Sequence, residues 1–142
     1  MKKLLCIIVT ICVVLGIGLG IRWCILSNTI VSTDIKYIRN TNELSNSVMT
    51  WLKTKEDTKG VFLGKKNGEG NLGEYYLYIN KLKNPAVGIR SDKYDGISIS
   101  FSMSDTLSAD SQIFRIKEVN KKMKYIILND KKINVNSIEE IP

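Results

Sequence analysis

An uninterrupted apolar stretch near the N-terminus places the strongest constraint on this chain. From Leu4 to Ile21 the sequence runs for 18 residues without a charged side chain. As an α-helix this stretch would extend roughly 27 Å, close to the hydrocarbon thickness of a bilayer. The sequence therefore predicts a membrane-spanning helix within residues 1–26.

Three fates of this stretch follow different sequence rules. A cleaved signal peptide needs small residues before the cut, and only Gly18 and Gly20 offer them. A lipoprotein needs a small residue just before its cysteine, whereas Trp23 precedes Cys24. Tryptophan is favoured at the membrane interface, so Trp23 suits a span that stays in place. An uncleaved anchor is therefore the favoured prediction, with cleavage and lipidation as alternatives.

The charges beside the stretch set the expected orientation. Lys2, Lys3 and the terminal amine precede it, and Arg22 follows it. Because basic residues favour the cytoplasmic side, we expect a single-pass protein of the cell membrane with its N-terminus inside. Residues 27–40 are polar and β-branched, which indicates a juxtamembrane spacer. Residues 41–142 then form the expected extracytoplasmic domain, which reaches membrane lipid only through the N-terminal helix.

Two absences narrow the chemistry open to that domain. The chain has no histidine, and its three cysteines, Cys6, Cys12 and Cys24, lie in or beside the apolar stretch. Histidine-dependent dyads and triads, thiolate nucleophiles and the common zinc sites are therefore excluded beyond residue 26. No glycine-rich phosphate loop follows a strand, and no cofactor is expected. The net charge of +7 is spread along the chain, which favours a solvated lysine-rich surface over nucleic-acid binding.

Hydrophobic periodicity predicts an α+β domain. An apolar stripe at intervals of four indicates one helix, beginning at Thr41 or Asn42 and ending at Lys55, with Asn40 and Glu43 in capping-box positions. After residue 59 the period changes to two. The spacer is expected to end in a short strand at residues 34–38. Within the domain, strands are expected at residues 61–64, 74–80, 97–102, 112–119, 124–129 and 133–135. The pattern predicts a mostly antiparallel sheet of five or six strands, curled or packed under the single helix.

Two connections between these strands are also predicted. Residues 81–95 contain Pro85 and Gly88, and we expect them to form a loop. Residues 112–119 and 124–129 are separated by a short polar segment, and we expect them to pair as a hairpin.

The tyrosine-rich strand carries the nearest approach to a binding surface. Tyr76 and Tyr78 share one face, and Lys81 and Lys83 follow closely. Aromatic rings beside cations on a sheet can stack on sugars or bases. Ordinary packing of the two rings on the second face of the sheet is the alternative, and it is favoured.

Catalytic and metal-binding patterns are incomplete. Asp92 and Asp95 resemble half of a calcium loop, but the third oxygen ligand and the later glutamate are missing, so a solvated turn is favoured. No serine lies in a Gly-x-Ser-x-Gly or Ser-x-x-Lys motif. A serine–lysine dyad remains open, because it needs no histidine. No catalytic residue is assigned.

The order of elements over residues 45–130 resembles one known group of proteins. The segments concerned are Thr50-Trp51-Leu52-Lys53, Lys59-Gly60-Val61-Phe62, Tyr75-Tyr76-Leu77-Tyr78-Ile79, Lys83-Asn84-Pro85-Ala86-Val87-Gly88-Ile89 and Ile113-Phe114-Arg115-Ile116-Lys117. In this order they are similar to the protease-complex subunit (PrcB-like) families of anchored Firmicutes proteins. Only Pro85 and Gly88 match the glycine-rich motif of those families, and their later Tyr-Pro is absent here. The resemblance implies a non-enzymatic β module associated with an extracellular protease.

These observations favour a non-catalytic, membrane-anchored extracytoplasmic module that acts on an envelope or secreted protein partner. One alternative is a small envelope hydrolase with serine–lysine or carboxylate chemistry. Another is an immunity protein that protects against a secreted toxin.

Overall fold

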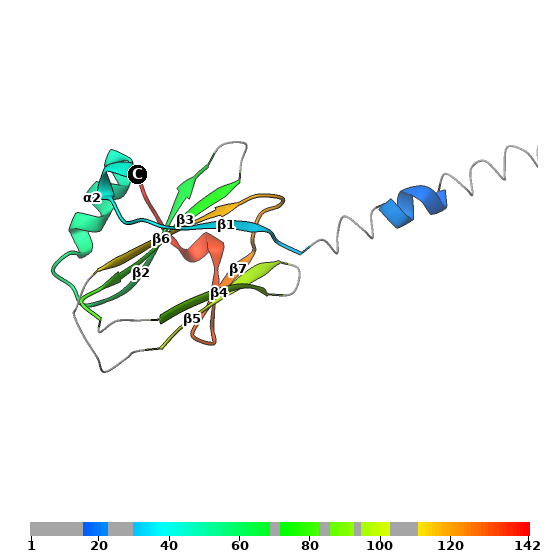
Figure 1. Cartoon of the computed structure of the whole chain (residues 1–142). Coiled ribbons are helices and arrows are strands. Elements are labelled where there is room, and N and C mark those ends of the chain that lie inside the picture. The colour runs from blue at the N-terminus through cyan, green and yellow to red at the C-terminus, as the bar shows by residue number, and fades with distance from the viewer. Residues whose placement is uncertain (1–15, 23–29, 69–71, 83–85, 93–94, 103–110) are drawn as a thin grey trace, which may run out of the picture.

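Figure 1 shows the computed structural model, which describes residues 16–22, 30–68, 72–82, 86–92, 95–102 and 111–142. Residues 16–22 are helical, and Ile21 is exposed within them. Among the described residues, no helix has both the length and the apolar character needed to cross a membrane. Leu4 and Trp23 lie outside the described residues, so the membrane anchor stays a prediction.

The first sheet has five strands in the order β1-β6-β3-β2-β9 (Figure 1). These are β1 (Thr33–Tyr37), β6 (Gln112–Glu118), β3 (Gly73–Asn80), β2 (Gly60–Asn67) and β9 (Glu139–Glu140). All neighbours run antiparallel except β2 and β9, which are parallel. Strand β6 pairs with both β1 and β3, so β1, in the segment predicted to be a spacer, is part of the domain.

The second sheet has four strands in the order β4-β5-β7-β8. These are β4 (Ala86–Asp92), β5 (Gly96–Ser102), β7 (Tyr125–Leu128) and β8 (Lys131–Asn134). Strands β5 and β7 run parallel, and the other two pairs are antiparallel. The α+β prediction is therefore confirmed, but the prediction of one sheet with five or six strands is wrong.

Helix α2 (Asn46–Lys55) forms a third layer on the first sheet. The central strand β3 is consequently buried on both faces. Tyr75, Leu77 and Ile79 pack into the apolar cluster between the two sheets. Tyr76 and Tyr78 point the other way and pack beneath α2. The alternation of period two on β3 thus serves two cores, because each face of the strand meets a different layer.

A glycine on β2 lets the helix approach the sheet closely. A Cβ atom at Gly64 would lie 2.8 Å from the Trp51 ring and 2.8 Å from the Ile141 side chain. Both side chains belong to the cluster beneath α2. Any larger residue at position 64 would displace Trp51 and Ile141, so the close packing of α2 on the sheet requires glycine there.

The helix begins later than the capping pair predicts. Asn40 does act as a cap, because its Oδ1 accepts a hydrogen bond from the Asn42 N–H at 3.0 Å. That bond closes a short 3-10 turn over Thr41–Glu43, and α2 starts only at Asn46. Glu43 forms an ion pair with Lys36 of β1 instead of completing a capping box.

The predictions for two connections are also wrong. Residues 86–92 of the expected loop form β4, an edge strand whose exposed positions include Gly88 and Arg90, so its sequence alternation is weak. The expected hairpin fails because β6 and β7 belong to different sheets. The Lys124 N–H donates to the Asp95 carbonyl at 2.8 Å, which directs the chain into the second sheet.

Candidate functional site

The structure separates the four residues of the predicted tyrosine–lysine surface. Tyr76 and Tyr78 are only 4% and 6% exposed, because α2 covers their face of the sheet. Lys81 is exposed just after β3, and Lys83 lies outside the described residues. The hypothesis of an open aromatic face on β3 is therefore wrong. The favoured alternative, in which both rings pack within the fold, agrees with the structure. Tyr78 and Lys81 nevertheless line one groove, which provides a different kind of site.

This groove, the helix–sheet groove, has a volume of about 500 Å³ and lies between α2, the end of β1 and strands β3 and β6. Its lining consists of Tyr37, Ile38, Arg39, Thr41, Met49, Leu52, Lys53, Glu56, Tyr78, Asn80, Lys81, Ser111 and Ile113. Ile38, Leu52 and Ile113 are buried members of the cluster beneath α2. The groove thus opens directly onto the second apolar core.

A chain of hydrogen bonds forms the polar part of the groove. The Tyr78 hydroxyl donates to Ser111 Oγ at 3.4 Å, and the Ser111 hydroxyl donates to Asn80 Oδ1 at 2.7 Å. The amide of Asn80, which is 1% exposed, donates to the carbonyls of Lys55, Glu56 and Thr58. These carbonyls lie at the C-terminal end of α2, where helices leave acceptors unsatisfied. The chain fixes the floor of the groove to the end of the helix.

Cationic side chains surround the opening. Among the described lining residues, the three cations Arg39, Lys53 and Lys81 outnumber the single acidic residue, Glu56. Lys81 Nζ lies 4.0 Å from Asp57 Oδ1, and both groups are exposed. Among the described residues, no acidic partner lies within salt-bridge distance of Arg39 or Lys53. Apolar walls with a positive rim suit a ligand that is partly apolar and carries negative charge.

The sequence does not predict most of this groove. Arg39 lies in the segment predicted to be a spacer, and Lys53 lies in the predicted helix. Asn80 ends a predicted strand, and its sequence position indicates no binding role. Nothing in their local sequence links them, because three separate elements bring them together. The one sequence signal was Asn80, an amide at the end of a strand that is otherwise rich in aromatic and aliphatic residues.

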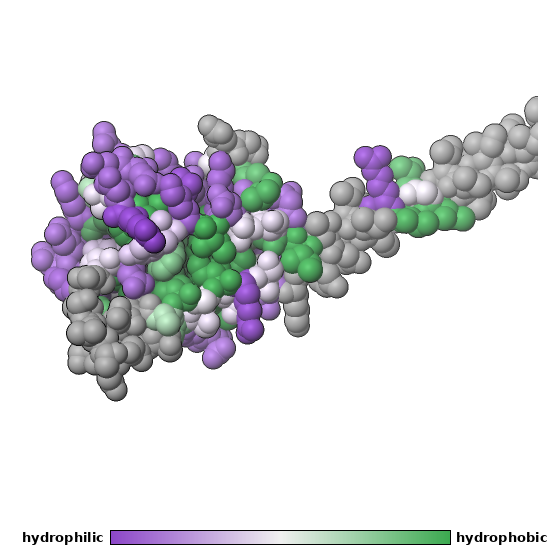
Figure 2. All heavy atoms as spheres, in the orientation of Figure 1, coloured by the Kyte–Doolittle hydropathy of each residue, from purple (hydrophilic) through white to green (hydrophobic). Residues whose placement is uncertain are grey.

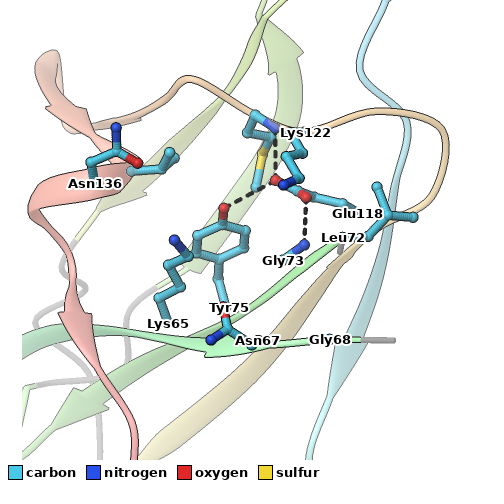
Figure 3. Close-up of a pocket in the computed structure, with 11 residues that line it drawn as sticks. Lys65, Asn67, Gly68, Leu72, Gly73, Tyr75, Glu118, Lys122 and Asn136 are labelled. Atoms are coloured by element: carbon cyan, nitrogen blue, oxygen red, sulfur yellow. Dashed lines mark hydrogen bonds between the residues drawn. The ribbon is translucent and has the colours of Figure 1, made fainter. Parts of the chain in front are cut away.

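A second, smaller cavity of about 190 Å³ lies at the other end of β3 (Figure 3). Glu118 is 1% exposed there, and it accepts three hydrogen bonds: from the Gly73 N–H at 2.5 Å, the Tyr75 hydroxyl at 3.0 Å and the Met123 N–H at 2.7 Å. Lys65 and Lys122 also line this cavity. Both carboxylate oxygens are engaged by the fold, so Glu118 acts as a brace between β6, β3 and the segment before β7.

The carboxylate of Glu118 also affects Tyr75. Burial, followed by the negative charge and hydrogen bond of Glu118, raises the pKa of the Tyr75 phenol above its ordinary value. Burial and the hydrogen bond to Glu74 raise the pKa of Tyr76 as well. Folding therefore favours the protonated phenols.

This arrangement predicts a loss of stability in alkali. Between the ordinary phenol pKa of about 10 and the higher folded values, the unfolded chain binds fewer protons than the folded chain, so the free energy of unfolding falls as pH rises. Tyr75→Phe and Tyr76→Phe should each reduce this slope, and the double variant should reduce it further. Urea unfolding followed by circular dichroism between pH 8 and 11 measures the slopes; an unchanged slope in the double variant contradicts the prediction.

The two acidic residues that resemble half of a calcium loop, Asp92 and Asp95, both bond to other side chains of the fold. Asp92 accepts a hydrogen bond from the Tyr125 hydroxyl at 3.0 Å. Asp95 pairs with Lys124 at 3.1 Å and Lys121 at 3.3 Å, and these bonds lower the pKa of its carboxyl. Within the described ranges, no three acidic or cysteine side chains gather as a metal site would require.

Comparison with protein-family models, with curated proteins and with solved structures finds no match to this chain.

Proposed function

We propose that this chain is a non-catalytic binding module, anchored at the outer face of a cell membrane, that holds an acidic and partly apolar segment of a protein partner. The observation that carries the proposal is the helix–sheet groove, with apolar walls from the second core and the cations Arg39, Lys53 and Lys81 around its opening. The apolar stretch from Leu4 to Ile21 supports the membrane location.

The size of the groove favours a short segment over a whole interface. A volume of about 500 Å³ lies within the range of sites that enclose a few side chains. Met49 and Leu52 would contact an aliphatic or aromatic residue of the partner, and the rim would attract a neighbouring carboxylate. Desolvation of the apolar part would supply most of the affinity, and the charges would set the orientation and the association rate.

The resemblance to the protease-complex subunit families agrees with this proposal in kind, since it also implies a non-enzymatic module with a protein partner. It does not specify the groove. The proposal therefore depends on the groove, and the test addresses the groove directly.

Reversing the rim charge should weaken partner capture about tenfold. The variant is Arg39→Glu with Lys53→Glu, in a full-length chain that carries a photoreactive amino acid in place of Met49. Expressed in a Gram-positive host and irradiated, the parent should form a discrete cross-linked product with an envelope protein. The variant should form about a tenth as much, measured by immunoblot of the membrane fraction.

The matched control is Arg90→Glu with Lys131→Glu, which makes the same charge change at exposed positions of the second sheet. The control should leave the cross-linked product unchanged, and the photoreactive residue in place of Ser100 should give none. If the control lowers the yield as much as the rim variant, the attraction is a general effect of net charge and the groove is not the site.

A further inference from the structure

We infer that β1 is a pairing edge through which two copies of this chain associate, joining their first sheets antiparallel across a two-fold axis. Strand β1 lies at the edge of the first sheet, and β6 is its one strand partner among the described residues. The inference concerns the backbone edge of β1, which shares Tyr37 with the helix–sheet groove.

The backbone of β1 presents free hydrogen-bonding groups along its outer side. The Ile38 N–H donates to the Ile113 carbonyl at 2.9 Å, and the Val119 N–H donates to the Ser32 carbonyl at 3.0 Å. Even-numbered residues of β1 therefore bond to β6, and in an antiparallel ladder the alternate residues point the other way. The N–H and C=O groups of Thr33, Ile35 and Tyr37 consequently face outward, and no described residue bonds to them.

This edge lacks the usual protection against pairing. Ile35 and Tyr37 are 40% and 44% exposed on the face that continues the inter-sheet core, and apolar side chains reach the surface at the level of β1 in Figure 2. Natural edge strands are normally shielded by short length, proline, bulges or charged side chains, above all lysine. The edge strand β8 has two exposed lysines, and β9 has only two residues. Strand β1 has five residues without proline, and its one lysine, Lys36, is paired with Glu43.

The charges on β1 select a second copy of the same strand. Since the odd-numbered residues supply the hydrogen bonds, the symmetric register places Ile35 opposite Ile35 of the second copy. Asp34 then lies opposite the second copy's Lys36 on both sides of the axis. A shift of two residues in either direction would place Asp34 opposite Asp34, or Lys36 opposite Lys36, and like charges directly opposite are destabilising.

Other features of the fold support this choice. In the symmetric register the two charge pairs occupy non-hydrogen-bonded positions, where opposing side chains are closest. The ion pair with Glu43 already orders the Lys36 side chain on the same face of the sheet as Asp34, so pairing with a second copy would cost little further side-chain entropy. The other long edge strand, β4, offers no such match, because self-pairing about Ile89 would place Gly88 opposite Arg90.

The register gives a sharp test with two charge variants. Asp34→Lys leaves two cations on this face of β1, and Lys36→Asp leaves two anions. Each full-length variant, purified in mild detergent, should self-associate at least tenfold more weakly than the parent in sedimentation velocity. An equimolar mixture of the two should regain the parent's association, because every opposing pair is then of opposite charge.

The mixture also separates association from misfolding, since a chain that failed to fold would not regain affinity. The control pair is Asp130→Lys, on the turn before β8, and Lys131→Asp, at the start of β8, which should leave self-association unchanged alone and mixed. A monomeric parent overturns the inference, as do single variants that associate like the parent or a mixture that remains monomeric.

Discussion

Glu118→Gln should lower the free energy of unfolding by about 3 kcal/mol, the largest effect expected of any single-atom change in this chain. Three donors converge on the carboxylate, two of them backbone N–H groups. An amide can accept at only one of its two terminal atoms, so its NH₂ group would face the Gly73 N–H or the Met123 N–H. That buried donor would then lose its partner.

The loss should appear as cooperative destabilisation of the whole domain, because Glu118 joins β6, β3 and the segment that enters the second sheet. Urea unfolding of the full-length chain, followed by circular dichroism, measures it. Glu140→Gln makes the same change at an exposed position of β9 and should shift stability by less than about 0.5 kcal/mol. Equal effects at the two positions would show that Glu118 does not brace the fold.

Asn80→Asp should be nearly as damaging, at about 2–3 kcal/mol near neutral pH. The amide of Asn80 donates to three carbonyl oxygens at 2.8–3.0 Å. A carboxylate would direct negative charge at these acceptors in a position that is 1% exposed. The end of α2 would lose its attachment to β3, and the floor of the helix–sheet groove would be displaced.

A pH signature distinguishes this cause from a general loss of packing. Burial and the facing carbonyls should raise the pKa of the introduced carboxyl, so protonation restores a donor and part of the stability as pH falls. The deficit relative to the parent should therefore shrink between pH 7 and pH 5. Asn42→Asp, at an exposed site, should show no such recovery. A deficit at Asn80 that is constant with pH would contradict the electrostatic explanation.

The two strongest structural residues lie at opposite ends of β3. Glu118 braces the end at which β3 begins, and Asn80 fastens the end at which α2 is attached. Asn80 also lines the floor of the helix–sheet groove, and β6 separates the open edge of β1 from β3.

The sequence predicted individual elements where one face of a strand or helix was apolar. The strand from Ile97, with Ile99 and alternating serines, was predicted correctly, because β5 has one face in the core. The sequence did not predict β4. This strand lies at a sheet edge and is little buried, so its apolar and polar residues alternate only weakly. The start of α2 was misplaced because Asn40 caps a 3-10 turn, a distinction that depends on the contact between Glu43 and Lys36.

The sequence by itself determined the α+β class, the alternation along β3 and β5, and the expectation of a membrane span from Leu4 to Ile21. These follow from composition and period, which are local properties of the chain. Only the tertiary structure decided that there are two sheets, that Tyr76 and Tyr78 lie beneath a helix, and that Arg39, Lys53 and Lys81 surround one groove. The physical reason is that burial of β3 on both faces and the meeting of distant cations depend on contacts between elements, which no local pattern encodes.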